Sequence, residues 1–145
     1  MATQYDAIII GTGQSGPSLA TKLAGTGMKV AIIERKLFGG TCVNTGCIPT
    51  KTLVASARAA YMAKRAADFG VMVDGSIVVD MKKVKARKDG VVRRSNQGVE
   101  NWLKNTQNLK VYEGQSSLRQ RQWRFTGGRQ DFYQRRCASV NSSRL

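Results

Sequence analysis

The 145-residue chain has no histidine and few acidic residues, cysteines and prolines. Without histidine, no imidazole can act as a general acid or base. A structural zinc site needs four ligands, and the three cysteines cannot complete one without histidine, so no metal site is expected. The sequence also has no uninterrupted apolar run of membrane-spanning length, which argues against a membrane protein.

The first ten residues lack the basic start and the cleavage site of a secretory signal peptide. We therefore expect a cytoplasmic protein. In that reducing compartment, a close pair of cysteines is more typical of a catalytic or metal-binding site than of a structural disulfide. The length predicts one domain that can bury a core, without a second domain to form a cleft.

The scarcity of acidic residues leaves 9 of them against 24 lysines and arginines, a formal net charge of +15. Such a charge raises the alternative of a noncatalytic basic protein that binds nucleic acid. The charge is uneven, because residues 1–118 carry 17 basic and 8 acidic side chains, whereas residues 119–145 carry 7 and 1. The basic side chains of the second segment are all arginine, whereas lysine predominates before it. This distribution indicates a break in composition and weakens the nucleic-acid hypothesis.

A dinucleotide-binding pattern occupies the N-terminal third of the chain. Residues 5–10 form an isoleucine-rich run typical of a buried parallel strand. A turn reading GTGQSG follows over residues 11–16, and residues 17–24 have the apolar spacing of a helix. A second strand over residues 29–33 ends in Glu34. This order of strand, glycine turn, helix, strand and acid predicts an α/β fold with a parallel sheet.

Each residue of this pattern has a physical role in holding a nucleotide. Gly11 allows the tight turn, Gly13 lets the backbone approach a pyrophosphate, and Gly16 lets the helix pack closely on the strand. The helix N-terminus offers free N–H groups to phosphate oxygens. Glu34 is placed to accept a hydrogen bond from a ribose hydroxyl, which disfavours a 2′-phosphate. The pattern alone does not separate NAD from FAD.

Two cysteines, Cys42 and Cys47, lie in the segment 39–51, which reads GGTCVNTGCIPTK. An alanine-rich helix is expected over residues 54–67, so both thiols lie near its start. Residues five apart on a regular helix are too distant for a disulfide, whose Cα atoms must lie within about 7 Å. If the two are to pair, the backbone must be irregular, and Gly46 and Pro49 are the residues that would allow it.

The position before a helix gives these thiols a reactive setting. A helix N-terminus lowers the pKa of a nearby thiol, and Lys51, one turn beyond Cys47, adds positive charge. A redox pair, part of a metal site and two inert thiols all stay open on these residues alone. The pair's place just after a cofactor pattern favours electron transfer between a cofactor and a disulfide.

The segment GGTCVNTGCIPTK resembles the redox motif of the flavin-dependent pyridine nucleotide-disulfide oxidoreductases. Its residues 41–44, TCVN, are most similar to mercuric reductase, and the chain as a whole resembles the mercuric reductase and dihydrolipoamide dehydrogenase branches of that family, from about Tyr5 to Ser116. The resemblance implies that the Gly11 turn binds FAD, within a partial Rossmann-like FAD-binding domain. It implies a disulfide, lipoamide or Hg(II) as substrate, and NAD(P)H and a homodimer only for full-length members.

The resemblance also implies roles for single residues. Cys42 would be the interchange thiol that attacks substrate, and Cys47 the thiol beside the flavin. Lys51 would lie near the flavin ring, Gly40 and Thr41 would line the FAD, and Ser116 would stand near its adenine end. Thr45 and Thr50 depart from the family's usual valine and serine.

Beyond this motif, residues 80–105 predict a long basic helix interrupted at Asp89-Gly90 and Gln97-Gly98, and residues 109–113 predict a strand. We interpret the basic residues of the helix as a solvated face.

The resemblance stops near Arg119. Dropping the first base of the Asp131 codon permits the translation IFINVGAR, which the family has at the strand before its nicotinamide domain. The same shift turns residues 121–123 into a permitted Val-Asn-Gly, a plausible hairpin turn. We therefore expect a partial FAD-binding domain over residues 1–118, with a frameshift between Gly114 and Arg121. Residues 119–145 would then be an out-of-frame, poorly ordered tail, and an inert truncated product stays an alternative.

Overall fold

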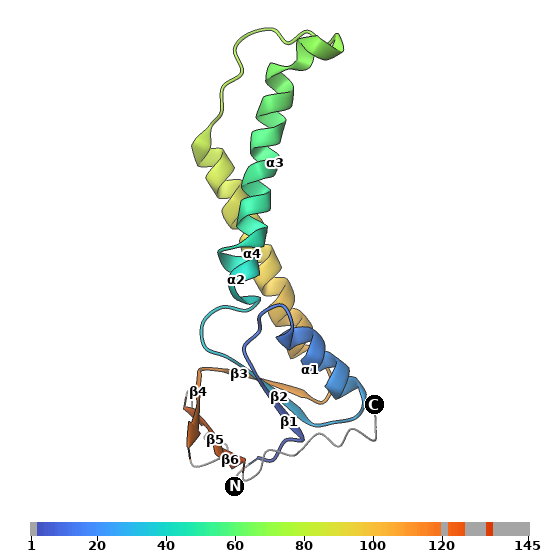
Figure 1. Cartoon of the computed structure of the whole chain (residues 1–145), viewed down its shortest axis with the longest axis vertical. Helices are drawn as coiled ribbons and strands as arrows, with labels where there is room; N and C mark the ends of the chain where they lie inside the picture. Colours follow the sequence, from blue (N-terminus) through green and yellow to red (C-terminus); the bar gives the residue numbers. More distant parts are fainter. Residues whose placement is uncertain (1–2, 120–121, 127–132, 135–145) are drawn as a thin grey trace.

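A computed structural model describes residues 3–119, 122–126 and 133–134. A parallel sheet with the strand order β1-β2-β3 forms one end of the molecule (Figure 1). Strand β1 spans Ala7–Ile10, β2 spans Val30–Glu34 and β3 spans Leu109–Glu113. The central strand, β2, pairs in parallel with both neighbours. The predicted α/β fold with a parallel sheet is confirmed.

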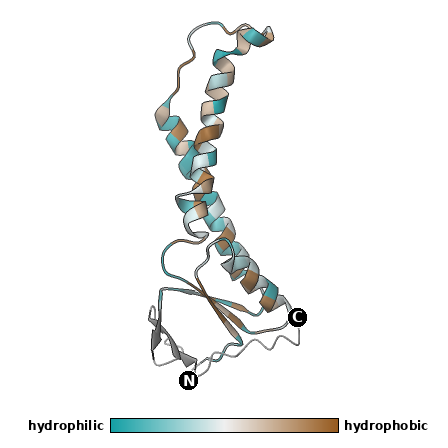
Figure 2. Cartoon of the chain, viewed as in Figure 1, coloured by the Kyte–Doolittle hydropathy of each residue, from teal (hydrophilic) through white to brown (hydrophobic). Residues whose placement is uncertain are grey.

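The core lies on both faces of β2, whose residues 30–33 are at most 2% exposed. Successive side chains of a strand point to opposite faces, so this strand supplies two clusters. On one face, Val30 and Ile32 pack beneath the helices with Phe38 and Leu103. On the other face, Ala31 and Ile33 pack with Tyr5 and Tyr112, whose hydroxyl groups are hydrogen-bonded to each other. Hydrophobic residues accordingly dominate the strands of this sheet (Figure 2).

The helices project from this sheet. Helix α1 (Gly16–Gly25) lies against it, α2 (Gly40–Asn44) leads into α3 (Cys47–Lys64), and a short 3-10 turn, η1 (Ala66–Phe69), precedes α4 (Met81–Lys104). Helices α3 and α4 form a long antiparallel hairpin that extends away from the sheet (Figure 1). Large apolar side chains remain exposed on this hairpin, among them Val54, Tyr61, Phe69, Met72, Val78 and Met81. In the described part of the chain, no helix is both long and apolar enough to cross a bilayer.

The predicted interruptions of the basic helix are wrong, because α4 runs unbroken through Gly90 and Gly98. The helix begins with the carboxylate of Asp80 accepting hydrogen bonds from the N–H groups of Lys82 and Lys83, at 2.9 and 3.1 Å. A glycine inside a helix costs about 1 kcal/mol relative to alanine. Packing of the C-terminal part of α4 against the sheet offsets that cost, since Leu103 is fully buried in the core.

The expected start of the alanine-rich helix is also too late. Helix α3 begins at Cys47, so Cys47 and Pro49 both belong to its first turn. Proline is tolerated there because the first N–H groups of a helix have no intrahelical partner. The irregular backbone that the cysteine spacing requires is found at Thr45 and Gly46, between α2 and α3.

An antiparallel sheet follows β3. It consists of β4 (Gln115–Arg119), β5 (Gln122–Thr126) and β6 (Tyr133–Gln134). Strands β5 and β6 lie in the segment for which we expect an out-of-frame translation, and their pairing does not test the reading frame. Most of the codons on which that hypothesis depends encode residues 120–121, 127–132 and 135–145, which lie outside the described residues. The boundary at residue 118 stays a prediction.

Candidate functional site

The glycine turn after β1 combines a sharp bend, an open side and a tight helix contact. Gly11 has a φ of +93°, in the region that favours glycine. A Cβ atom at Gly13 would meet no atom within 4 Å, so that side of the turn is open. A Cβ atom at Gly16 would lie 2.2 Å from the carbonyl oxygen of Gly11. Only glycine therefore lets α1 start this close to the end of β1.

Glu34 ends β2, and its carboxylate is held from two sides. Oε2 accepts hydrogen bonds from the N–H and the hydroxyl of Thr12, at 2.9 and 2.6 Å, and Oε1 accepts one from the N–H of Lys36 at 2.9 Å. Partial burial raises the pKa of Glu34, but hydrogen bonds from Thr12, Lys36 and Arg35 outweigh it and lower the pKa below its usual value. The carboxylate is therefore charged and fixed in direction.

A pocket of about 360 Å³ opens where the three parallel strands end. It is lined by Gly11 and Glu34 together with Gly114, which follows β3, and the first two residues of β4, Gln115 and Ser116. The structure thus brings the predicted residues Gly11, Glu34 and Ser116 to one cavity. Ligands of open parallel sheets bind at this carboxyl edge of the strands.

A second glycine loop joins this turn to the cysteines. Gly39 and Gly40 have φ values of +87° and +60°. A Cβ atom at Gly40 would lie 2.9 Å from the Cα of Gly13, so the two loops are in contact. Gly40 is also the first residue of α2, which carries Thr41 and Cys42. The contact between Gly13 and Gly40 therefore joins the glycine turn, whose first residue lines the Glu34 pocket, to the helix that carries Cys42.

Cys42 and Cys47 lie on consecutive helices that approach closely at Gly46. A Cβ atom at Gly46 would stand 3.0 Å from the carbonyl oxygen of Thr41 and 3.4 Å from the Cα of Cys42. Both cysteines are free thiols; Cys42 is half-buried and Cys47 is exposed. The close approach of the two helix ends brings together thiols that a regular helix would separate.

Electrostatics couple the two thiols. A side-chain hydrogen bond to Cys47, burial and the charge of Cys47 raise the pKa of Cys42, whereas a hydrogen bond from the Cys47 backbone and, to a smaller extent, the positive charge of Lys51 oppose the rise. Cys42 therefore keeps its proton more strongly than an isolated cysteine. The charge of Lys51 therefore acts on the pair, and its predicted place near a flavin ring stays a prediction.

Three polar residues that the sequence reasoning did not single out organise the site. Asn96 of α4 donates hydrogen bonds to the Phe38 carbonyl oxygen at 2.8 Å and to Asn44 Oδ1 at 3.1 Å. Asn44 in turn donates to the carbonyl oxygens of Phe38 and Gly40, at 2.8 and 2.9 Å. The third is Thr12, which bonds Glu34. Asn44 lies inside the recognised motif, but no local signal connects Asn96 to it.

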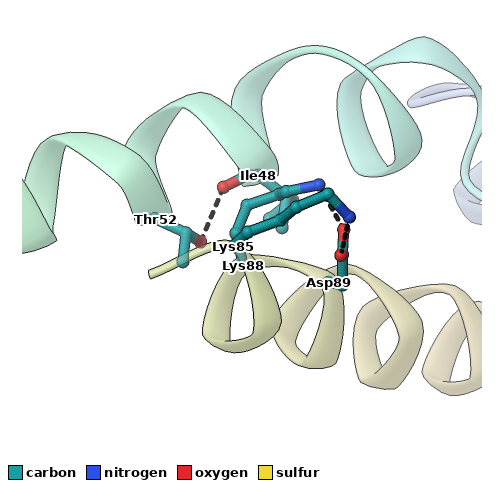
Figure 3. Close-up of polar contacts among 5 residues, drawn as sticks. All are labelled: Ile48, Thr52, Lys85, Lys88 and Asp89. Carbon is teal, nitrogen blue, oxygen red and sulfur yellow. Dashed lines mark hydrogen bonds and ion pairs between the residues drawn. The ribbon is translucent and has the colours of Figure 1, made fainter. Parts of the chain in front are cut away.

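The basic residues of α4 are partly neutralised within the protein. Lys85 and Lys88 both contact the carboxylate of Asp89, the former at 2.8 Å, as Figure 3 shows. Hydrogen bonds from these two lysines lower the pKa of Asp89 to about 2.

Within the residues that the structure describes, no three histidine, cysteine, aspartate or glutamate side chains gather as a metal site would require.

Comparisons with known proteins agree with this geometry. The family model described as pyridine nucleotide-disulphide oxidoreductase matches residues 5–131. The dihydrolipoyl dehydrogenase of Acholeplasma laidlawii is 43% identical over 114 residues, which are 79% of this chain and 34% of that protein. The dihydrolipoyl dehydrogenase of Bacillus subtilis is 40% identical over 114 residues, which are 79% of this chain and 24% of that protein.

A solved structure shows the same fold. The HOCl-induced flavoprotein disulfide reductase RclA from Escherichia coli, in its Cu(II) complex, superposes with a TM-score of 0.71 at 31% identity. The match covers 90% of this chain and 26% of RclA. The chain thus spans between about a quarter and a third of the length of these relatives. With the family model matching most of its residues, the chain belongs to the pyridine nucleotide-disulphide oxidoreductase family.

Proposed function

We propose that this chain forms the FAD-binding part of a flavin-dependent disulfide oxidoreductase, with Cys42 and Cys47 as its redox pair. The observation that carries the proposal is the contact between the two glycine loops, where a Cβ at Gly40 would be 2.9 Å from the Cα of Gly13. Because Gly40 begins the helix that bears Cys42, one elongated ligand could touch both the Glu34 pocket and the thiol segment.

The residues present fit an adenine dinucleotide. The open side of Gly13 leaves the backbone accessible to a pyrophosphate, and the first turn of α1 has N–H groups without intrahelical partners. Glu34 would hold a ribose hydroxyl, and Ser116, in the same pocket, would lie near the adenine. Gly40 and Thr41 would continue the cradle toward the thiols. The charge of Glu34 disfavours a 2′-phosphate, which supports FAD over NADP at this site.

The two thiols are suited to different tasks. When bound, FAD would supply the transfer of an electron pair between a nicotinamide and the disulfide. Cys42 is half-buried and its hydrogen bond to Cys47 raises its pKa, whereas Cys47 is exposed at the first turn of α3. By the arrangement that the family resemblance implies, Cys47 would be the thiol beside the flavin and Cys42 the interchange thiol. Lys51 would balance the negative charge of the pair.

The substrate and partners are inferred from the family. The relatives named dihydrolipoyl dehydrogenase favour a small disulfide such as lipoamide as substrate, and the TCVN sequence of residues 41–44 keeps Hg(II) as an alternative acceptor. We infer that NAD(P)H and a homodimer belong to a longer protein, and that this chain alone has little or no turnover. The apolar side chains exposed on the α3–α4 hairpin support this inference, because in a longer or dimeric protein other protein surface would cover them.

We further propose that residues 119–145 are translated out of frame. Resequencing the gene and reading the downstream DNA in all three frames tests this directly. A shifted frame that continues into the family's later segments is expected. An intact frame without those segments would overturn this part of the proposal and leave the cofactor site unaffected.

Separate cysteine variants of the frame-corrected, FAD-loaded protein test the thiol roles. Cys42→Ser leaves Cys47 to face the flavin, so it should keep or strengthen a long-wavelength charge-transfer band while losing disulfide exchange. Cys47→Ser should lose both the band and turnover. The frame-corrected parent, with both cysteines intact, serves as the reference. Equal loss of the band in both variants, or parental reductase activity in either, would show that the roles are wrongly assigned.

A further inference from the structure

The second residue of the glycine turn, Thr12, is fully buried and joins three separate segments. Its hydroxyl donates a hydrogen bond to Oε2 of Glu34 at 2.6 Å and accepts one from the N–H of Gly39 at 3.2 Å. Its own N–H donates to the same Oε2 at 2.9 Å. One side chain therefore connects the turn after β1, the end of β2 and the loop before α2.

We propose that Thr12 is a positioning residue of the cofactor site, which orients the Glu34 carboxylate toward a ribose hydroxyl and holds the Gly39–Gly40 loop against the Gly11 turn. The inference rests on the proposed function and extends it to a residue outside the glycines and the acid of the dinucleotide pattern. Thr12 is fully buried, so it acts on the ligand through Glu34 and the loop and not by direct contact of its side chain.

Counting acceptor positions shows how Thr12 would orient the acid. Each carboxylate oxygen can accept about two hydrogen bonds. Thr12 fills both positions of Oε2, so a ribose hydroxyl has to be accepted by Oε1, which accepts the N–H of Lys36 at 2.9 Å. The N–H of Arg35 also stabilises the carboxylate, and a ribose hydroxyl would take its place at Oε1. Without the Thr12 hydroxyl, Oε2 gains a free position and the carboxylate can rotate. Thr12 thereby determines which oxygen is offered to the pocket.

The same hydroxyl fixes the loop that leads to the thiols. It accepts the N–H of Gly39 in a buried position, where a missing acceptor would leave that N–H unpaired. The next residue, Gly40, is already at its closest approach to Gly13. Valine has nearly the shape of threonine but neither donates nor accepts, whereas serine does both. These two substitutions therefore separate the hydrogen bonds from the packing.

The first experiment titrates the Glu34 carboxyl carbon by NMR in the ligand-free chain. Thr12→Val should raise the pKa of Glu34, because the Thr12 hydroxyl contributes the largest of the hydrogen bonds that lower it. Thr12→Ser should restore the parental titration. Thr52→Val is the matched control, since Thr52 is also buried but bonds the Ile48 carbonyl oxygen of its own helix at 2.8 Å (Figure 3). Parental titration of Glu34 in Thr12→Val would overturn the proposal.

The second experiment measures binding of ADP and of its 2′-deoxy and 3′-deoxy analogues to the parent and to Thr12→Val. In the parent, loss of the recognised hydroxyl should weaken binding about tenfold, as expected for a hydrogen bond to a charged group. In Thr12→Val the same loss should matter much less, a non-additive result that packing alone does not produce. An equal loss in both proteins would contradict the positioning role.

The outcomes distinguish this inference from the proposed function. If the parent does not bind ADP, the cofactor proposal fails at this pocket, and Thr12 is then judged on the Glu34 titration. If Thr12→Val does not fold by circular dichroism, hydrogen exchange of the Gly39 amide in the unaltered chain decides. A strongly protected Gly39 N–H supports the bond to Thr12, and free exchange overturns it.

Discussion

Replacing Gly16 and Gly13 by alanine, one at a time, separates the folding role of the glycine turn from its binding role. At Gly16 the new Cβ would lie 2.2 Å from the carbonyl oxygen of Gly11 and 3.3 Å from its carbonyl carbon. Both atoms belong to the backbone and cannot rotate away. At Gly13 the new Cβ would meet nothing within 4 Å. An added methyl group therefore clashes with the backbone at position 16 and only fills open space at position 13.

The magnitude follows from how far α1 would have to move. Ordinary van der Waals contact begins near 3.4 Å, so relief of the 2.2 Å contact needs a shift of about 1 Å. Ala20 and Ala24 of α1 are at most 2% exposed and pack on β2, so the shift would loosen the core. Overpacking costs about 1–3 kcal/mol, and we expect the upper end. The melting temperature should fall by roughly 5–10 °C.

The assay combines urea and thermal unfolding with ADP binding. Gly16→Ala should lose stability as calculated. Gly13→Ala should keep its stability within about 0.5 kcal/mol but lose ADP, because its methyl group fills the space that a pyrophosphate needs. Equal destabilisation by the two substitutions would refute the packing argument, and parental ADP affinity in Gly13→Ala would refute the binding argument.

Three further predictions test the fold and the acid. Gly98→Ala should stabilise the chain by about 1 kcal/mol in urea unfolding, because a Cβ at Gly98 meets nothing within 4 Å; a loss instead would mean that α4 is not continuous there. Leu103→Ala should lower the free energy of unfolding by about 2–5 kcal/mol, because Leu103 is fully buried. Met72→Ala is the control and should change it by less than about 0.5 kcal/mol, because Met72 is 83% exposed. Equal losses in the two variants would place Leu103 outside the core. Because the pKa of Glu34 is lower in the folded chain than its unfolded value of about 4.3, the ionised carboxylate stabilises the fold at a pH above about 4.3, and this stabilisation is lost as the pH falls through the folded pKa. Glu34→Gln should therefore flatten the acidic part of a plot of urea midpoint against pH. An unchanged plot would contradict the lowered pKa.

Local patterns in the sequence predicted the part of the fold that surrounds the Glu34 pocket. The apolar strands, the glycine turn and Glu34 follow one another within 34 residues, so their spacing in the sequence carries their arrangement in space. The break between α2 and α3 could also be predicted, because two thiols five residues apart cannot meet on a regular helix.

Long-range packing explains what the sequence could not predict. Gly90 and Gly98 lower local helix propensity, but contacts of α4 with α3 and the sheet keep the helix continuous. The hydrogen bonds of Asn96 to Phe38 and Asn44 span more than 50 residues, and no periodicity reveals them. Thr12 stands at a variable position of its motif, so only its three-dimensional contacts distinguish it.

Anaerobic reductive titration of the FAD-loaded, frame-corrected protein tests the central claim most directly. A Cys42–Cys47 disulfide in electronic contact with the flavin accepts an electron pair in addition to the pair that the flavin accepts. The parent should therefore consume about twice as much reductant as the Cys42→Ser variant before the flavin is fully bleached. A protein that takes up no FAD, or a parent and variant that consume equal amounts, would contradict the assignment of this chain to flavin-dependent disulfide chemistry.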